Sequence, residues 1–167
     1  MMPIKINLGC GKRKIRNFIN IDRNKNVRPD IIADLNFLPI KFGKIDYVYS
    51  EEVLEHIEDL ENLMRELYMI LKPKGKMRHI VPHFTSISAH IGNHVHTFST
   101  RGFVFCDHSE PESNFQSGVK YKIKARIVFN KCLKPFEFLA NLHHFFWEQY
   151  IRFPNAESII FEFEKTI

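Results

Sequence analysis

Residues 4–22 constrain the fold of this chain more than any other stretch of its sequence. Two short apolar runs, residues 4–8 and 18–21, have the composition of buried strands in a parallel sheet. Gly9-Cys10-Gly11 follows the first run, and two glycines there let the backbone turn sharply and approach a ligand closely. Asp22 ends the second run, where its carboxylate could accept hydrogen bonds from both hydroxyls of a ribose. The stretch therefore predicts a binding site for a nucleoside.

The same stretch departs from the fingerprint of a dinucleotide site. Lys14 stands where that fingerprint has its third glycine, and Asp22 comes much sooner than the acid expected about 20 residues on. A pyrophosphate needs a full helix N-terminus, whereas the space between the two runs barely reaches the roughly 10–12 residues of a parallel crossover. S-adenosylmethionine has no phosphate and does not need that helix. At these residues the sequence resembles the class I S-adenosylmethionine-dependent methyltransferases, in particular a compact subgroup with a shortened first crossover.

Two further motifs extend this resemblance to about residues 4–84. Residues 47–56 (Tyr-Val-Tyr-Ser-Glu-Glu-Val-Leu-Glu-His) and 71–76 (Leu-Lys-Pro-Lys-Gly-Lys) are similar to two more methyltransferase motifs at the family's spacing. The resemblance implies an α/β, Rossmann-like, mostly parallel sheet of seven strands with an antiparallel last strand and trimmed helices on one side. We expect one methyltransferase domain over residues 1–167, with a cofactor-binding half (1–84) and an acceptor-side, sheet-closing half (85–167).

Hydrophobic periodicity places the remaining elements. Apolar or alternating runs predict strands at residues 31–33, 45–49, 76–81, 119–129 and 158–164. Apolar residues from Val53 to Leu71 recur at helical spacing, so we expect a long amphipathic helix with Ser50 as its N-cap and acids in its first turn. An aromatic-rich helix is expected over residues 135–151, opened by a proline in its first turn.

The family motifs and the predicted strand ends assign the cofactor site residue by residue. By the resemblance, Asp34 would bind the adenine amino group and the Leu35 amide the ring. Asp22 and Glu52 follow strands at the carboxyl edge of the sheet, where Asp22 would bind the ribose and Glu52 would face the methionine amino group or the acceptor. The alternatives are that Asp34 caps its own loop and that Glu52 serves only the helix dipole. The full expected set of cofactor contacts is Asn7, Leu8, Gly9, Cys10, Gly11, Asp22, Asp34, Leu35, Ser50, Glu51 and Glu52.

Six histidines fall within thirty residues, at positions 79, 83, 90, 94, 96 and 108. One interpretation is a metal site built from His90, His94 and His96, completed by Cys106 and His108. Another is an acceptor-facing wall, and a third is a set of ordinary surface histidines. The resemblance favours the wall, so we expect no metal and assign the general base first to His94 and then to His83, because histidine suits that task at neutral pH.

Composition bounds the remaining possibilities. A chain of 167 residues with 44% hydrophobic and 26% charged residues fits one globular domain. The net charge of +5 comes from clusters at 12–16, 72–78 and 120–134, which we interpret as solvated surface rather than a nucleic-acid arm. Three cysteines without a close pair, no signal peptide and no apolar run of membrane-spanning length predict a soluble, cytoplasmic protein.

The acceptor itself has no signature in the sequence. We expect an unidentified methyl acceptor, a small molecule or saccharide rather than nucleic acid, and interpret the aromatic helix as core or as the contact of a homodimer. Two other classes of function stay open: a non-catalytic nucleoside-binding or interaction protein, and a metal-dependent enzyme organised by the histidines.

Overall fold

The computed structural model of the chain describes residues 2–107, 119–151 and 155–166. Their strands and helices follow one another along the chain as β1 (Lys5–Leu8), β2 (Ile19–Asp22), β3 (Ile31–Ile32), β4 (Ile45–Glu51), α1 (Leu60–Ile70), β5 (Leu71–Pro82), β6 (Tyr121–Val128), α2 (Pro135–Leu142), α3 (His144–Phe146) and β7 (Ser158–Lys165). Single helical turns lie at η1 (Lys25–Val27), η2 (Leu54–His56), η3 (Ile87–His90), η4 (Val104–Cys106) and η5 (Trp147–Ile151).

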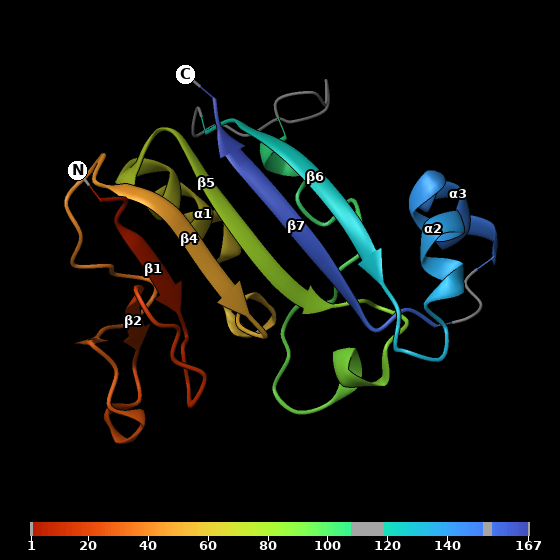
Figure 1. Ribbon diagram of the computed structural model, residues 1–167, viewed down its shortest axis with the longest axis horizontal. Coiled ribbons are helices and arrows are strands. Elements are labelled where there is room, and N and C mark those ends of the chain that lie inside the picture. The colour runs from red at the N-terminus through yellow and green to blue at the C-terminus, as the bar shows by residue number, and fades with distance from the viewer. Residues whose placement is uncertain (1, 108–118, 152–154, 167) are drawn as a thin grey trace.

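The seven strands form one sheet in the order β3-β2-β1-β4-β5-β7-β6. Strands β1 to β5 pair in parallel, whereas β7 runs antiparallel to both β5 and β6 (Figure 1). The order reverses at β1 and β4, so the loops that leave these two strands diverge at the carboxyl edge of the sheet. The expected α/β fold with an antiparallel last strand is confirmed.

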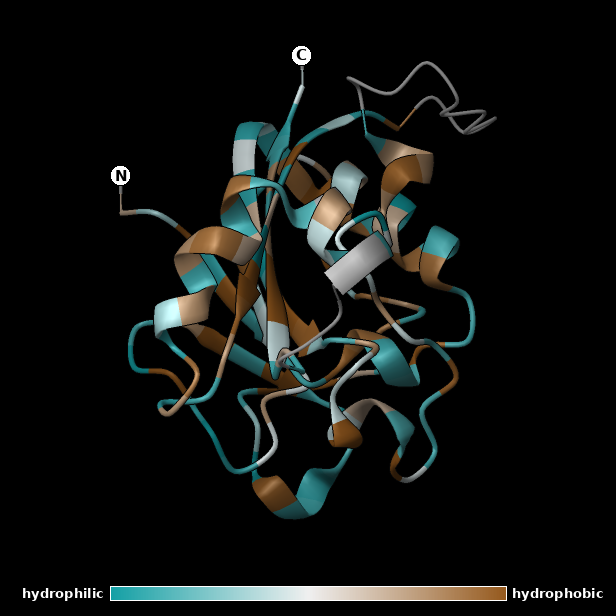
Figure 2. Cartoon of the chain, turned by 90° about the vertical axis from the view of Figure 1, so that its right-hand side faces the viewer, coloured by the Kyte–Doolittle hydropathy of each residue, from teal (hydrophilic) through white to brown (hydrophobic). Residues whose placement is uncertain are grey.

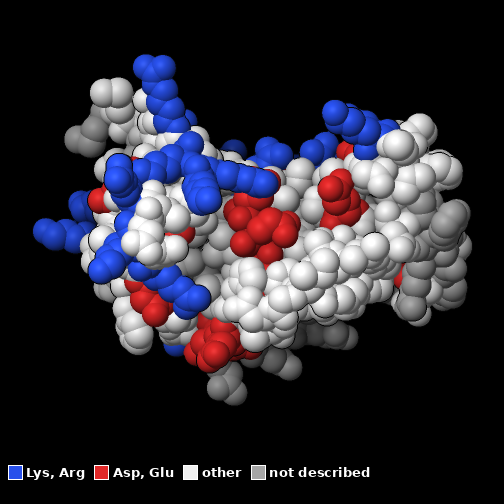
Figure 3. Space-filling view, turned by 90° about the horizontal axis from the view of Figure 1, so that it is seen from below, with Lys and Arg blue, Asp and Glu red and all other residues white. Residues whose placement is uncertain are grey.

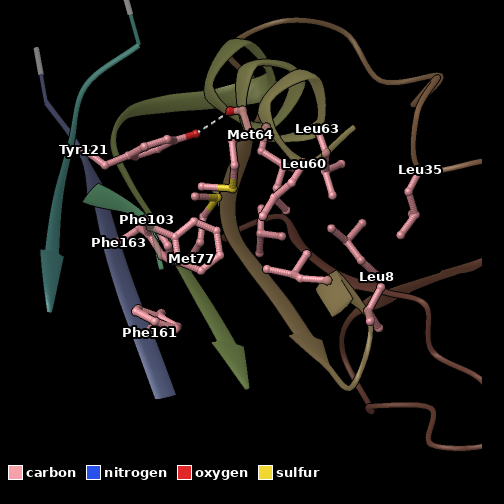
Figure 4. Packing of buried hydrophobic residues seen from close by; sticks show 14 of the residues in the cluster. Leu8, Leu35, Leu60, Leu63, Met64, Met77, Phe103, Tyr121, Phe161 and Phe163 are labelled. Carbon is pink, nitrogen blue, oxygen red and sulfur yellow. Dashed lines mark hydrogen bonds between the residues drawn. The ribbon is translucent and has the colours of Figure 1, made fainter. Parts of the chain in front are cut away.

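One face of the sheet packs against α1 and carries the main core. Leu63, Met64 and Leu67 of α1 are fully buried against sheet residues such as Val48. Figure 4 shows this packing and the hydrogen bond, 2.9 Å long, that the buried Tyr121 hydroxyl donates to the Met64 carbonyl. Burying side chains of this size stabilises the fold by about 1.5–3 kcal/mol each.

The opposite face of the sheet is polar where β5, β7 and β6 cross it. The outward residues of β6 alternate with buried ones and include Lys122 and Lys124. Across the strands, Lys76 lies 3.6 Å from Glu164 and Arg78 lies 4.0 Å from Glu162. Charged, half-exposed side chains of this kind are stable on a sheet face without a helix above them, as expected for a fold with trimmed helices on one side.

The predicted long helix begins nine residues later than expected, because its N-cap is Asp59 and not Ser50. Ser50 lies inside β4, and α1 begins only at Leu60, with the Asp59 side chain accepting a hydrogen bond from the Asn62 amide. Glu52 has a φ of +55°, which ends the strand and prevents a helix from starting there. Val53 and Leu54, at the start of the predicted helix, are buried instead at the beginning of the single helical turn η2.

The predicted aromatic helix is broken in two places. It ends as α2 at Leu142, and α3 and η5 follow separately. Ala140 and Trp147 are buried in a second small core, but Phe138 is 72% exposed and Leu139 is 63% exposed. Figure 2 looks from the side of α2 and α3 and shows hydrophobic residues on the helical segments outside the central sheet. A homodimer through this helix stays a prediction.

No helix among the described residues is long and apolar enough to cross a membrane.

We expect the free energy of unfolding to fall as the pH drops from 7 to 5.5, because His79 is buried without charge. Its Nδ1 lies 2.7 Å from the Ser50 hydroxyl, and complete burial lowers the pKa of His79 from 6.5 to about 3. Below pH 6.5 the unfolded chain binds a proton that the folded chain does not, so stability is complete above pH 6.5 and is lost towards pH 3. The loss from this residue is about 1 kcal/mol between pH 7 and 5.5.

Urea denaturation at the two pH values measures this loss. The His79→Gln variant should lack that part of the pH dependence, whereas His90→Ala, which removes an exposed imidazole, should keep it. Equal pH dependence in His79→Gln and the unmodified chain would show that another group is responsible.

Candidate functional site

Two adjoining cavities open at the carboxyl edge of the sheet, around the ends of β1, β2 and β4. One of 430 Å³ is lined by residues of the β1 loop and by the end of β4, and the other, of 510 Å³, by the ends of β2 and β3 and by the turn after β4. Gly9 and Glu52 line both, so the two cavities form one elongated site. Each volume falls within the range of about 300–1,000 Å³ typical of small-molecule sites.

The glycines after β1 shape the wall between the cavities. Gly9 and Gly11 have φ values of +58° and +48°, in the left-handed region that favours glycine. A Cβ at Gly9 would lie 2.6 Å from Cγ2 of Val53, so only glycine lets the two loops approach this closely. A Cβ at Gly11 would meet no atom within 4 Å and would project into open space.

Asp22 is held in place by backbone amides. Its Oδ2 accepts a hydrogen bond of 2.8 Å from the Gly11 amide, and its Oδ1 accepts one of 2.8 Å from the Asn24 amide. The carboxylate lines the 510 Å³ cavity, and each of its oxygens retains a lone pair for a ligand hydroxyl. The structure therefore holds a hydrogen-bond acceptor, the Asp22 carboxylate, at the position predicted to bind ribose.

Side chains of two asparagines replace the helix that is missing between β1 and β2. The buried Asn7 donates to Asn20 Oδ1 at 3.0 Å, and that oxygen also accepts from the Ile15 amide at 2.8 Å. The Asn20 amide group donates onward to Asp30 at 2.9 Å. The two side chains thus bind backbone groups of Arg13, Ile15 and Phe18 in the crossover. Sequence reasoning missed Asn20 because it lies inside an apolar run.

Asp34 and Leu35 line the same cavity as Asp22. Asp34 Oδ1 accepts hydrogen bonds of 2.9 Å from the Asn36 backbone amide and side chain. Asp34 therefore caps its own loop, as the predicted alternative has it. Its side chain lines the cavity nonetheless.

The residues that end β4 have separate environments. Glu51 accepts hydrogen bonds from Arg13 at 2.7 Å and from the Tyr49 hydroxyl at 3.1 Å, which fastens the β1 loop to β4 across the 430 Å³ cavity. The pKa of Glu52 is raised, first because its own carboxyl group is buried and second because the Glu55 and Glu51 carboxylates lie nearby.

Among the predicted cofactor contacts, the side chain of Cys10 lines the site, whereas those of Leu8 and Ser50 do not. Leu8 is fully buried in the core, and Ser50 is fully buried against His79, so neither side chain lines the two cavities. Cys10 lines the 430 Å³ cavity, where burial first and the Asp22 charge second raise the pKa of its thiol. A thiol with a raised pKa is a weak nucleophile, so Cys10 fills space there.

The two histidines proposed as bases have opposite placements. His83 is fully buried, and its Nδ1 and Nε2 lie 2.7 Å from the Thr85 hydroxyl and 3.1 Å from Glu148 Oε1. Hydrogen bonds from His83 and Thr100 outweigh the effect of burial and hold the pKa of Glu148 below its usual value. His83 thus joins the segment after β5 to η5. Because it is fully buried and lines neither cavity, it is not placed to act as the second base.

His94 lies instead beside the turn that follows β4. Its ring centroid is 4.6 Å from that of His56, which lines the 510 Å³ cavity, and its Nδ1 is buried. Sequence reasoning identified His94 but missed His56 and Glu55, because these two were placed on an exposed stretch of the predicted long helix.

Charge is divided across the carboxyl edge of the sheet. Figure 3, which looks onto this edge, shows basic side chains gathered on one side and acidic ones towards the middle. The exposed basic residues of the loops after β1 and β2 are Lys12, Arg13, Lys14, Arg16, Arg23, Lys25 and Arg28.

Comparison with known proteins agrees with this geometry. The family model described as "Methyltransferase domain" matches residues 8–78. A curated relative is the human mitochondrial arginine-hydroxylase NDUFAF5, which is 29% identical in an alignment of 92 residues that covers 44% of this chain. The chain spans 27% of that relative's length.

Solved structures share the fold over nearly the whole chain. An S-adenosylmethionine-dependent methyltransferase from Mesorhizobium loti is 14% identical, with a TM-score of 0.63 over 97% of this chain and 90% of that one. Phosphoethanolamine N-methyltransferase 2 from Haemonchus contortus, in complex with S-adenosyl-L-methionine, is 16% identical, with a TM-score of 0.62 over 100% of this chain and 50% of that one. Residues 8–78 thus match a methyltransferase domain, and the described chain has the fold of S-adenosylmethionine-dependent methyltransferases.

Proposed function

We propose that this chain transfers a methyl group from S-adenosylmethionine to an oxygen or a nitrogen of an acceptor that binds beside Glu52, His56 and His94. The observation that carries the proposal is the continuity of the two cavities. Asp22 and Asp34 line the part of the 510 Å³ cavity suited to a nucleoside, and His56 and Asn93 line the same cavity; we call the part beside His56 and Asn93 the acceptor end.

The residues of the site fit the cofactor group by group. Asp22 has free lone pairs for a ribose, and Asp34 with Leu35 forms an acid and an apolar wall suited to adenine. The amino-acid end fits the 430 Å³ cavity, where Arg13 offers a cation to the carboxylate and Glu51 an acceptor to the ammonium group.

When bound, S-adenosylmethionine supplies a methyl group on a sulfonium centre. Because methyl transfer is a displacement at that carbon, the protein's part is to hold the acceptor in line and to exclude water. The turn formed by Glu52 and Val53 lies against Gly9, between the two cavities, and therefore lies where acceptor and cofactor would meet.

An acceptor hydroxyl or amine must also lose a proton during the reaction. Among the predicted bases, His94 lies beside the acceptor end of the site, next to His56. The chain therefore offers two imidazoles as proton-accepting groups at this end of the site.

A small molecule or saccharide remains our proposal for the acceptor. Glu52 and Glu58 line the acceptor end, and their carboxylates would repel a phosphodiester backbone. A cytoplasmic location belongs to the same proposal, because all three cysteines are free, as in a reducing compartment.

Asp22→Ala should weaken S-adenosylmethionine binding roughly 10- to 150-fold, which corresponds to the loss of about 1.5–3 kcal/mol for a charged acceptor. Isothermal titration calorimetry measures the affinity. Asp30→Ala is a matched control, since Asp30 also accepts a backbone amide hydrogen bond, from Asn20 at 2.7 Å, but lines neither cavity. Equal affinity in Asp22→Ala and the unmodified chain would rule out this binding mode.

Methyl-labelled S-adenosylmethionine tests the activity itself. The purified chain is incubated with the labelled cofactor and with separate small-molecule, nucleic-acid and protein fractions of a cell extract. We expect label in the small-molecule or saccharide fraction. Label confined to nucleic acid would overturn the acceptor class, and no label in any fraction, from protein that binds the cofactor, would overturn the transfer reaction.

A further inference from the structure

A cluster of three ionisable side chains at the acceptor end of the site has no role in holding the cofactor. The ligand atoms of Glu55, His56 and His94 all lie within 4.8 Å of one another. The two imidazole rings meet edge to face, with 4.6 Å between their centroids and 79° between their planes. Among the described residues, no other group of three or more histidine, cysteine, aspartate or glutamate side chains is close enough to share a metal ion.

Glu55 is the most unusual member of this cluster. It is completely buried, and neither of its carboxylate oxygens has a hydrogen-bond partner among the described residues. Nδ1 of His94 is also buried without a partner there. Burying a carboxylate without a partner costs several kcal/mol, so a group that interacts with all three side chains would stabilise this part of the fold.

The backbone fixes the cluster in place. Glu55 and His56 lie in η2, directly after β4, whereas His94 lies in a loop nearly forty residues further on. The Glu55 carbonyl accepts hydrogen bonds from the Val95 amide at 2.8 Å and from the His96 amide at 3.2 Å. The two segments are thus joined beside the cluster, and the three side chains start from a preorganised arrangement.

We propose that Glu55, His56 and His94 bind one divalent transition-metal ion of the zinc or manganese type. Two imidazoles and one carboxylate are a donor set that these ions favour, and they leave coordination positions open for water or substrate. Donor atoms around one such ion lie roughly 3–3.5 Å apart, so small side-chain rotations would bring the three ligands to their positions.

This set differs from the metal site considered from the sequence. His90 Nε2 lies 2.9 Å from the Phe84 carbonyl oxygen, and Cys106 is buried with its thiol towards the Phe103 carbonyl. His108 lies outside the described residues. Only His94 belongs to both sets. The proposed site of Glu55, His56 and His94 replaces the expectation that the chain binds no metal.

The position of the cluster indicates what the ion would do. His56 lines the 510 Å³ cavity together with Glu52 and Asn93, so an ion bound to it faces the acceptor end. A metal ion there would bind an acceptor oxygen and favour loss of its proton. This role rests on the proposed function, whereas metal binding itself does not.

Calorimetry with metal alone tests the binding. The full chain is stripped with a chelator and titrated with MnCl₂ and, separately, ZnCl₂, without cofactor or acceptor. We expect one ion per chain. Glu55→Gln and His94→Ala should each weaken binding more than about 100-fold, because even outer-shell partners of a metal contribute about 10–100-fold. His90→Ala, an exposed histidine outside the cluster, should bind like the unmodified chain.

Thermal unfolding separates a binding role from a structural one. Glu55→Gln removes a buried charge while keeping the side-chain volume, so its stability in chelator should equal or exceed that of the unmodified chain. Mn²⁺ should raise the melting temperature of the unmodified chain but not that of Glu55→Gln. Absence of metal binding, or equal binding in Glu55→Gln, would overturn the proposal, and neither outcome bears on cofactor binding, which calorimetry with S-adenosylmethionine measures separately.

Discussion

Gly11→Val should abolish S-adenosylmethionine binding and leave the chain folded. Gly11 has a φ of +48°, which costs an L-residue roughly 1–2 kcal/mol and costs a β-branched residue most. Its backbone amide holds Asp22 at 2.8 Å, so any shift of the turn displaces the carboxylate expected to bind ribose. The added side chain would also occupy cavity space, because no atom lies within 4 Å of a Cβ built there.

Calorimetry and circular dichroism together check this result. The variant should give no binding heat with millimolar cofactor while keeping the far-ultraviolet spectrum of the unmodified chain. Gly43→Val is the matched control, since Gly43 has a φ of +63° and equally open space but lies in the loop before β4, away from both cavities. Affinity retained by a folded Gly11→Val variant would mean that the cofactor binds elsewhere.

The strands of the sheet were predictable because the sequence signal for each one lies within a single short segment. Each strand is marked by its own short apolar run, because its side chains are buried. Residues 4–8, 18–21 and 45–49 are therefore strands close to their expected bounds. The antiparallel β7 followed from the family resemblance and from the alternation along it.

The start of α1 was not predictable from periodicity alone. Val53 and Leu54 are buried, as a helix would bury them, yet Glu52 has a left-handed backbone and Asp59 supplies the N-cap. Burial in a tight turn and burial on a helix face leave the same pattern in a short apolar sequence.

That error hid the most polar part of the candidate site. On the expected helix, Glu55 and His56 lay outside the buried apolar face, whereas in η2 Glu55 is completely buried. The role of His83 was hidden for another reason, because its partner Glu148 lies 65 residues away. Long-range polar pairs depend on the packed fold and leave no local signature.

The family motifs predict the nucleoside end of the site better than the acceptor end. The nucleoside end is defined by backbone-held groups such as Asp22 and by glycine conformations, which the family motifs predict. The acceptor end combines the turn of the 47–56 motif with the loop of Asn93 and His94, which lies outside the three motifs, and a relative with 29% identity carries the name of a hydroxylase. Chemistry at this end therefore has to be tested on its own residues.

His94→Ala should lower the turnover of methyl transfer by about 10²–10⁴-fold and leave cofactor affinity within a few-fold. The reason is position: His94 contacts His56 at the acceptor end and lines neither cavity where the cofactor groups fit. The measurement uses the acceptor found by methyl labelling, with kcat from initial rates and affinity from calorimetry. His90→Ala serves as control, because its imidazole is exposed and lies outside the cluster.

Rescue distinguishes the two roles that His94 could have in this reaction. As a ligand of the proposed ion, its loss should be offset in part by excess Mn²⁺, because Glu55 and His56 remain to hold the metal weakly. As a general base, its loss should be offset by free imidazole in the presence of a chelator, and Mn²⁺ should have no effect. We expect rescue by Mn²⁺. Imidazole rescue in chelator would return His94 to the role of base and remove it from the metal site, whereas unchanged turnover in His94→Ala would exclude both roles.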